Sequence, residues 1–217
     1  MTGRRGFLHR AAAVGIGTGV GIALLPSPPE STAVPQSESE AGIAAGDADF
    51  EGPWLESTIT TEDETPIARY QYRRGDTGYE PTAPVNVVFV ADMDGLEGVM
   101  AVLEDVGWLR KPAEYVRYAW DRTDERYVPQ EATAAETYYG TSGRLHARCW
   151  EFEGLVSMQV HEDTGAYPRH GIESYTSGRT AMESLYSAHG WHVLESRVDL
   201  ENEQHDHDGL AAVIVES

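Results

Sequence analysis

The chain has 217 residues, with 36 acidic side chains against 16 basic ones and a formal net charge of −20. This charge argues against binding to nucleic acid or to an anionic membrane surface, because both would repel it. The acidic residues are spread along the chain. That favours adaptation to molar salt, where the Debye length is about 3 Å, and a haloarchaeal source. An acidic protein that binds cations or basic partners is the alternative. The single cysteine excludes an internal disulfide.

Residues 1–26 have the order of segments that is typical of a twin-arginine export signal. Arg4 and Arg5 precede a Phe-Leu pair in a segment without acidic residues, and a glycine-rich apolar run follows over 11–25. The run is shorter than the about 20 residues of a spanning helix. This disfavours a permanent anchor and leaves membrane attachment through an uncleaved signal as an alternative. We expect export across the cytoplasmic membrane to the cell surface or the medium.

Three further segments follow the signal. Residues 27–49 are rich in Pro, Ser, Glu, Ala and Gly, a composition that predicts a disordered acidic linker. Residues 50–83 form an N-terminal extension in which only an edge strand over 68–73 is expected. The compact domain is expected to span 84–217, a usual size for a single domain.

Strand and helix signals alternate within this domain. The apolar run 85–90 predicts a buried strand, and apolar residues at helical spacing predict a helix over 95–106. Asp94 is in position to cap this helix, and Gly107 to end it.

A second helix is expected over 178–189, with Thr180 and Glu183 as a capping box. It is followed by Gly190 and Trp191, and the first helix is likewise followed by a glycine and a tryptophan. This recurrence is either an internal pseudo-repeat or two helices that end in the most common way, and the sequence favours neither interpretation.

The remaining segments complete an α+β pattern. The stretch 112–127 is ambiguous, because its proline could open a helix. Residues 192–198 and 210–215 predict two strands joined by an acidic loop over 199–209. The expected fold is α+β, a mainly antiparallel sheet covered by two helices.

The strongest local pattern is a β-hairpin. The segments 144–150 and 155–161 each alternate between apolar and polar side chains, and the Glu-Gly pair between them fits a two-residue turn. In this register the two apolar faces match and His146 lies opposite His161. A slip of one residue would break both patterns, so the register is a firm prediction.

The polar face of this hairpin is the candidate functional site, and we expect it to face outward. Arginine pairs bind carboxylate or phosphate in bidentate fashion, and two histidines hold a transition metal when a third ligand is near. A histidine also serves as a general base. The candidate ligand-binding residues are Arg144, His146, Arg148, Trp150, His161, Asp163 and His170.

Two alternatives compete with ligand binding at this face. In the first, the arginines pair with carboxylates and the histidines pack in the interior, so that the face is structural. In the second, a divalent metal is bound. The weaker candidates for its ligands are His146, His161, His205 and His207, of which the last two lie in a loop that is expected to be solvated.

From Pro84 onward the sequence resembles the C-terminal domain of LssY-type proteins. The resemblance lies in the opening strand 84–90, the first helix with its Gly-Trp end, the Arg-x-His-x-Arg-x-Trp strand over 143–150, and the stretch 163–173. It implies a domain that is often attached to membrane-embedded phosphatase or DedA-like modules and whose own activity is unassigned. This chain carries no such module, and 176–179 replaces the acidic run expected before the last helix.

These observations predict an exported, non-enzymatic accessory or ligand-binding domain at the cell envelope, without a cofactor. Its ligand would be a small anion, a lipid head group or an envelope protein. The alternative is a hydrolase of phosphate or other esters that uses His146, His161 and His170, with or without a divalent metal. A purely structural envelope protein is the third possibility, and it predicts that the Arg-His face is buried by salt bridges.

Overall fold

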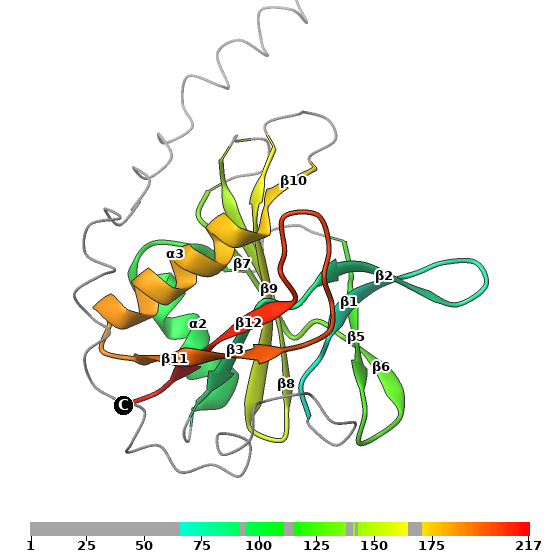
Figure 1. The fold of residues 1–217 in the computed structure, drawn as a ribbon, viewed down its shortest axis with the longest axis horizontal. Helices are drawn as coiled ribbons and strands as arrows, with labels where there is room; N and C mark the ends of the chain where they lie inside the picture. The colour runs from blue at the N-terminus through cyan, green and yellow to red at the C-terminus, as the bar shows by residue number, and fades with distance from the viewer. Residues whose placement is uncertain (1–65, 92–93, 111–114, 138–140, 142, 165–170) are drawn as a thin grey trace, which may run out of the picture. The chain divides into compact units, whose positions relative to one another are not determined.

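The computed structural model describes residues 66–91, 94–110, 115–137, 141, 143–164 and 171–217 (Figure 1). The expected signal, the expected linker and His170 lie outside the described residues. The described part is mixed α+β, with two helices and mostly sheet, and its strands are largely antiparallel. This confirms the predicted fold class at that level. Neither described helix combines the length and the apolar sequence that crossing a membrane requires.

The larger sheet contains eight strands in the order β11-β12-β3-β9-β8-β7-β4, with β10 paired to β9. All of its pairs are antiparallel except β12 with β3. The strands expected over 85–90, 192–198 and 210–215 are present. The bounds are β3 Val87–Val90, β4 Leu109–Arg110, β7 Ala132–Ala135, β8 Leu145–Phe152, β9 Leu155–Asp163, β10 Ile172–Ser174, β11 His192–Asp199 and β12 Leu210–Val215.

A second, four-stranded sheet has the order β2-β1-β5-β6 (Figure 1). It consists of β1 Tyr70–Arg74, β2 Tyr79–Pro84, β5 Tyr118–Asp121 and β6 Arg126–Pro129. The helix considered for 112–127 is therefore wrong for the described residues 115–127. Alternation explains β5, because Ala119 is buried in the core while its neighbours Tyr118 and Trp120 are only partly buried.

The folded part extends N-terminal of Pro84, where the sequence placed the start of the compact domain. Ile67 and Ala68 are 2% and 1% exposed. The backbone N–H of Ala68 donates to Ser157 Oγ on β9 at 3.0 Å. Ile67 and Ala68 therefore belong to the core that the larger sheet builds.

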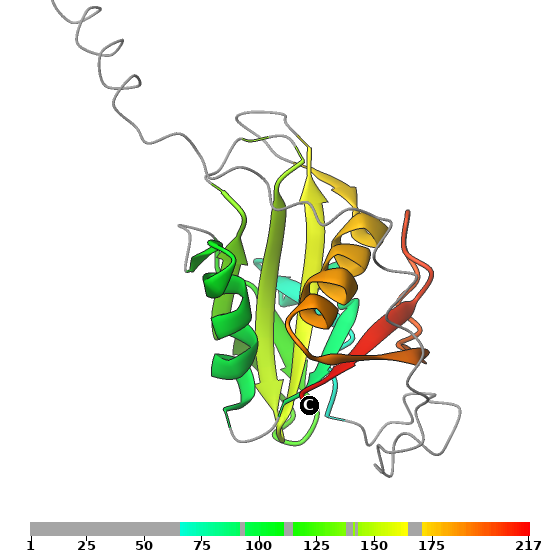
Figure 2. The ribbon, with the colours of Figure 1, turned by 90° about the vertical axis from the view of Figure 1, so that its left-hand side faces the viewer.

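The two helices, α2 Gly95–Asp105 and α3 Tyr175–Ala188, run alongside the larger sheet (Figure 2). Both contribute to one apolar cluster with it. Val99 of α2 and Met182 of α3 are members of this cluster, together with Phe89 and Cys149 from the strands of the sheet. The opposite face of the larger sheet packs in a separate cluster that includes residues of the smaller sheet. The larger sheet is thus covered on both faces.

Helix α2 begins where it was predicted but is capped by a different residue. Asp94 occupies the cap position without a side-chain hydrogen bond. Instead, the Glu151 carboxylate on β8 accepts from the N–H of Leu96 at 3.0 Å. A carboxylate at this end is favoured by the helix dipole. The cap thus comes from tertiary structure, which a local pattern does not reveal.

Helix α3 begins three residues earlier than the predicted start at 178, so the capping box of Thr180 and Glu183 is wrong. The cap is Ser174, whose hydroxyl accepts from the N–H of Ser177. Both helices end as predicted, with a glycine at positive φ of 88° and 86° followed by tryptophan. Whether this recurrence is an internal pseudo-repeat stays a prediction.

Candidate functional site

The hairpin β8–β9 forms in the predicted register. His146 pairs with His161, Arg148 with Gln159 and Cys149 with Met158. The turn residues, a glutamate and a glycine, have φ angles of 51° and 82°. Two successive positive φ angles are the signature of the type I′ turn that matches the twist of a hairpin. Local sequence was therefore sufficient to fix this pairing.

The polar face of the hairpin is buried, which contradicts the expectation that it faces outward. Arg144, His146, Arg148 and His161 are 1%, 0%, 3% and 2% exposed. The smaller sheet covers this face, and two hydrogen bonds connect the sheets. Arg148 Nη1 donates to Gln71 Oε1 on β1 at 3.4 Å, and the Trp150 indole donates to a backbone carbonyl of β6 at 3.2 Å. We call Arg144, His146, Arg148, Gln159, His161 and Asp163 the polar cluster.

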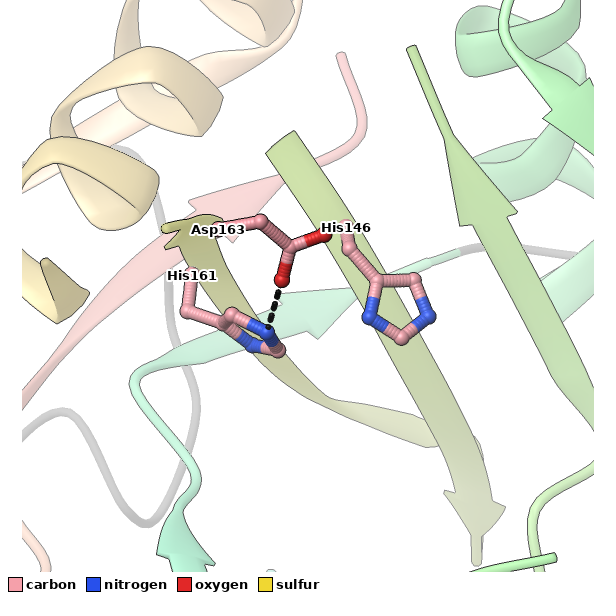
Figure 3. Close-up of side chains that lie close together, drawn as sticks. All are labelled: His146, His161 and Asp163. Atoms are coloured by element: carbon pink, nitrogen blue, oxygen red, sulfur yellow. Dashed lines mark hydrogen bonds and ion pairs between the residues drawn. The ribbon is translucent and has the colours of Figure 1, made fainter. Parts of the chain in front are cut away.

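Asp163 is the centre of the polar cluster, because its two oxygens bind different partners, one of which, His161, is drawn in Figure 3. Oδ2 accepts from Nε and Nη2 of Arg144 at 2.7 and 2.6 Å. Oδ1 lies 3.0 Å from Nε2 of His161. Burial raises the pKa of Asp163, but the hydrogen bond from His161 and the Arg144 guanidinium outweigh it, so the pKa is lowered. The carboxylate is therefore ionised at neutral pH.

Gln159 orients the imidazole of His161. Its Nε2 lies 2.8 Å from His161 Nδ1. An amide nitrogen only donates, so Nδ1 accepts and the ring proton sits on Nε2, facing Asp163. Turning the amide by half a rotation would present its oxygen instead, and Nδ1 would then carry a proton. The tautomer of His161 therefore depends on the orientation of one amide.

His146 completes a group of three potential metal ligands (Figure 3). Its ring stands across from that of His161, with centroids 5.3 Å apart and planes at 85°. One ligand atom from each of His146, His161 and Asp163 lies within 4.8 Å of the others. Two imidazoles and one carboxylate are a donor set that binds divalent transition metals.

The other proposed metal ligands, His205 and His207, are not part of a group of three potential ligands among the described residues. His205 is exposed and His207 is buried. Asn202 uses its amide nitrogen to donate to the carbonyls of Arg69 and Val85 at 2.7 and 2.9 Å. Its oxygen therefore accepts from Nε2 of His207, 3.0 Å away. This hydrogen bond gives His207 a structural role.

The loop that contains these histidines has mostly exposed residues, as expected, but it is also anchored to α3. Asp206 accepts from the hydroxyl of Ser174 at 2.6 Å and from the N–H of Tyr175 at 3.1 Å, at the start of α3. Asp208 forms a bidentate ion pair with Arg179, in which Nη1 and Nη2 donate to Oδ1 and Oδ2 at 2.6 and 3.1 Å. Their pKa values are lowered, chiefly by the hydrogen bonds to Ser174 and Arg179, and that of Asp208 falls to about 2.

Two residues beside the polar cluster were missed by the sequence analysis. Gln71 reaches Arg148 from the smaller sheet. The ring of Tyr175 lies 6.3 Å from that of His161 and 6.0 Å from that of His207. Burial raises the pKa of Tyr175 to about 12. The alternation around Gln71 was a usable signal, but nothing local indicated which strands it faces.

Comparison of the chain with protein-family models, with curated proteins and with solved structures gives no match. The resemblance to the LssY-type C-terminal domain stays a prediction.

Proposed function

We propose that the chain is an exported, non-enzymatic domain that binds a small ion in the polar cluster. The observation that carries this proposal is the convergence of two imidazoles and an ionised carboxylate in a place that protein atoms cover. His146, His161 and Asp163 are 0%, 2% and 2% exposed. An ion needs little space, and such side chains can replace its water ligands. An ester, in contrast, must bring its reacting atom within hydrogen-bond reach of a base. Burial therefore supports binding over hydrolysis.

A purely structural role is the competing proposal, and burial also supports it. The Arg144–Asp163 ion pair and the packing of Trp150 are what such a role requires. It gives no reason for two histidines to face each other beside that pair, since apolar residues at both positions would avoid burying polar rings. Ion binding accounts for the histidines as well as for the ion pair.

The test is a screen of inorganic ions against the thermal unfolding of the full chain in molar KCl. An ion that binds only the folded state stabilises it by RT ln(1 + [ion]/Kd), so Tm rises with the logarithm of the ion concentration once that exceeds Kd. We expect one class of ion to raise Tm in the wild type and in the exposed-site control His205→Gln, but not in His146→Gln. No response from any ion would favour the structural role.

The hydrolase alternative is tested with the same proteins. The rate at which p-nitrophenyl phosphate and p-nitrophenyl acetate are hydrolysed with the ion-loaded chain should not exceed the rate in buffer without protein. Turnover in the wild type that disappears in His146→Gln would replace the binding proposal with the hydrolase.

We also propose that this binding takes place outside the cytoplasm, at the cell envelope, in high salt. The support is the Arg4-Arg5 pattern before an apolar run and the net charge of −20. Replacing both arginines with lysine should keep the chain in the cytoplasmic fraction. Export of this variant at the wild-type level would contradict the twin-arginine route.

A further inference from the structure

We propose that the ion held by the polar cluster is a divalent transition metal, with His146, His161 and Asp163 as its protein ligands. Gln159 and Arg144 orient those ligands. This inference rests on the proposed function, because it names the ion for the same site.

The donor atoms are already near the separation that a shared metal requires. Nitrogen and oxygen ligands bind zinc at about 2.0–2.2 Å, so two ligands at a tetrahedral angle lie roughly 3.4 Å apart. His161 Nε2 and Asp163 Oδ1 are 3.0 Å apart, and one ligand atom from each of His146, His161 and Asp163 lies within 4.8 Å of the others. Small side-chain movements therefore bring all three atoms around one ion.

The groups behind the ligands have the arrangement that metal sites use to orient their first ligands. A metal on Nε2 of His161 leaves the ring proton on Nδ1, which needs an acceptor. Gln159 lies at that nitrogen, and turning its amide supplies the oxygen. Among the described residues, no hydrogen-bond donor reaches this buried oxygen. Asp163 keeps its second oxygen on Arg144, which fixes the direction of the first.

The donor types select the class of ion. Imidazole nitrogen suits zinc, cobalt, nickel and copper, whereas magnesium and calcium require several oxygen ligands. The cluster offers two imidazoles but a single carboxylate, with a guanidinium on the far oxygen. Sodium and potassium also prefer oxygen. The site therefore discriminates against the cations that are abundant in brine, and we expect Zn²⁺ or Co²⁺ to bind in molar KCl.

The experiment uses the full chain without a histidine tag, stripped with a chelator and dialysed against Zn²⁺ or Co²⁺. We expect one metal per chain by elemental analysis and visible Co²⁺ absorption bands that Zn²⁺ abolishes. His146→Gln and His161→Gln should lose both signals. The matched control His205→Gln, which removes an exposed histidine, should keep them. Equal binding by control and cluster variants would mean adventitious surface binding and would overturn the inference.

Variants of Gln159 test the orienting role without touching a ligand. Gln159→Glu should tighten metal binding, because a carboxylate is a stronger acceptor for Nδ1–H, and Arg148 lies opposite to balance the added charge. Gln159→Leu should weaken binding by about 10-fold or more, as loss of such a partner typically does. These two variants also keep the inference testable if His146→Gln fails to fold. Identical affinities in both would overturn it.

The outcomes separate this inference from the proposed function. If Zn²⁺ and Co²⁺ do not bind, but phosphate or sulfate raises Tm in a His146-dependent way, the cluster binds an ion and the metal assignment is wrong. If no metal binds and no anion raises Tm, both proposals fail and the cluster is structural.

Discussion

His146 on β8 and His161 on β9 stand directly opposite each other, with ring centroids 5.3 Å apart and nearly perpendicular planes. Both rings lie on the face of the larger sheet that the smaller sheet covers. Imidazoles tolerate such burial when their nitrogens have partners, and His161 has Gln159 on one side and Asp163 on the other. The pair is thus part of an interior polar network rather than of a surface.

Removal of the charge on Asp163 should destabilise the protein strongly. Asp163→Asn keeps the side-chain shape but leaves the 1%-exposed Arg144 without its carboxylate. Breaking a buried ion pair in this way costs about 3–5 kcal/mol of unfolding free energy, to be measured by denaturant titration in molar KCl.

Two controls accompany this prediction. Asp124→Asn removes a carboxylate from an exposed ion pair with Arg126 and should change the unfolding free energy by less than about 1 kcal/mol. The double variant Arg144→Met with Asp163→Asn should lose less than the sum of the two single variants. Full additivity would show that the pair contributes no coupling energy.

The helix α3 should tolerate no side chain at Gly178. A Cβ at this position would lie 2.9 Å from the Cα and N of His161. Gly178→Ala therefore has to push the helix away from β9, at a cost of about 1–3 kcal/mol. The matched control is Gly98→Ala in α2, where the nearest atom would be at 3.4 Å. The control should be neutral or stabilise by up to about 1 kcal/mol through helix propensity. Equal effects of the two substitutions on denaturant midpoints would contradict the close contact.

His207 should make stability fall in mildly acidic solution. Burial, and next the charge of Arg179, lower its pKa from the ordinary 6.5. Below pH 6.5, His207 is therefore protonated in the unfolded chain but still neutral in the folded chain. The unfolding free energy falls with pH until the pKa of His207 in the folded state is reached. Above pH 6.5 the contribution is constant.

His207→Gln isolates this effect, because glutamine still donates to Asn202 but does not titrate. Between about pH 8 and about pH 5, the wild type should lose more unfolding free energy than this variant does. The exposed-residue variant His205→Gln should follow the wild-type curve. Parallel curves for wild type and His207→Gln would show that His207 titrates normally in the fold.

Cys149 should be unreactive in the folded protein. Its side chain is fully buried in the strand β8, and burial raises the pKa of the thiol. Only the thiolate attacks Ellman's reagent, so modification requires unfolding. We expect no thiol to react in native buffer and one per chain in denaturant. Rapid modification under native conditions would mean that β8 opens locally.

The sequence predicted the hairpin well and its surroundings poorly, for physical reasons. Alternation on both strands and a Glu-Gly turn determine the register of β8–β9 locally. The cover over its polar face comes from β1, β2, β5 and β6, which are distant in sequence. In those strands the partly buried aromatics Tyr118 and Trp120 flank a buried alanine, so the usual contrast between apolar and polar sides is lost. Exposure of the site was therefore not predictable.

The error at the start of α2 has the same origin, whereas at α3 the local cap Ser174 was overlooked in favour of Thr180. Glu151 and Asp206 bind the first turns of α2 and α3 from remote segments. Local capping patterns report only nearby side chains, and they pointed to Asp94 and to Thr180 with Glu183. A side chain that caps a helix from a distant part of the sequence cannot be recognised by such patterns, because they compare only residues a few positions apart.

The parallel pairing of β12 with β3 has a consequence for how the domain is made. β12 is the last strand along the chain, yet it lies between β11 and β3 rather than at an edge. The β8–β9 hairpin needs only neighbouring residues and can form early during synthesis. The contact between β3 and β12 must wait until residues 210–215 leave the ribosome. Until then β3 lacks one of its two neighbours and leaves one row of backbone N–H and C=O groups unpaired in the sheet.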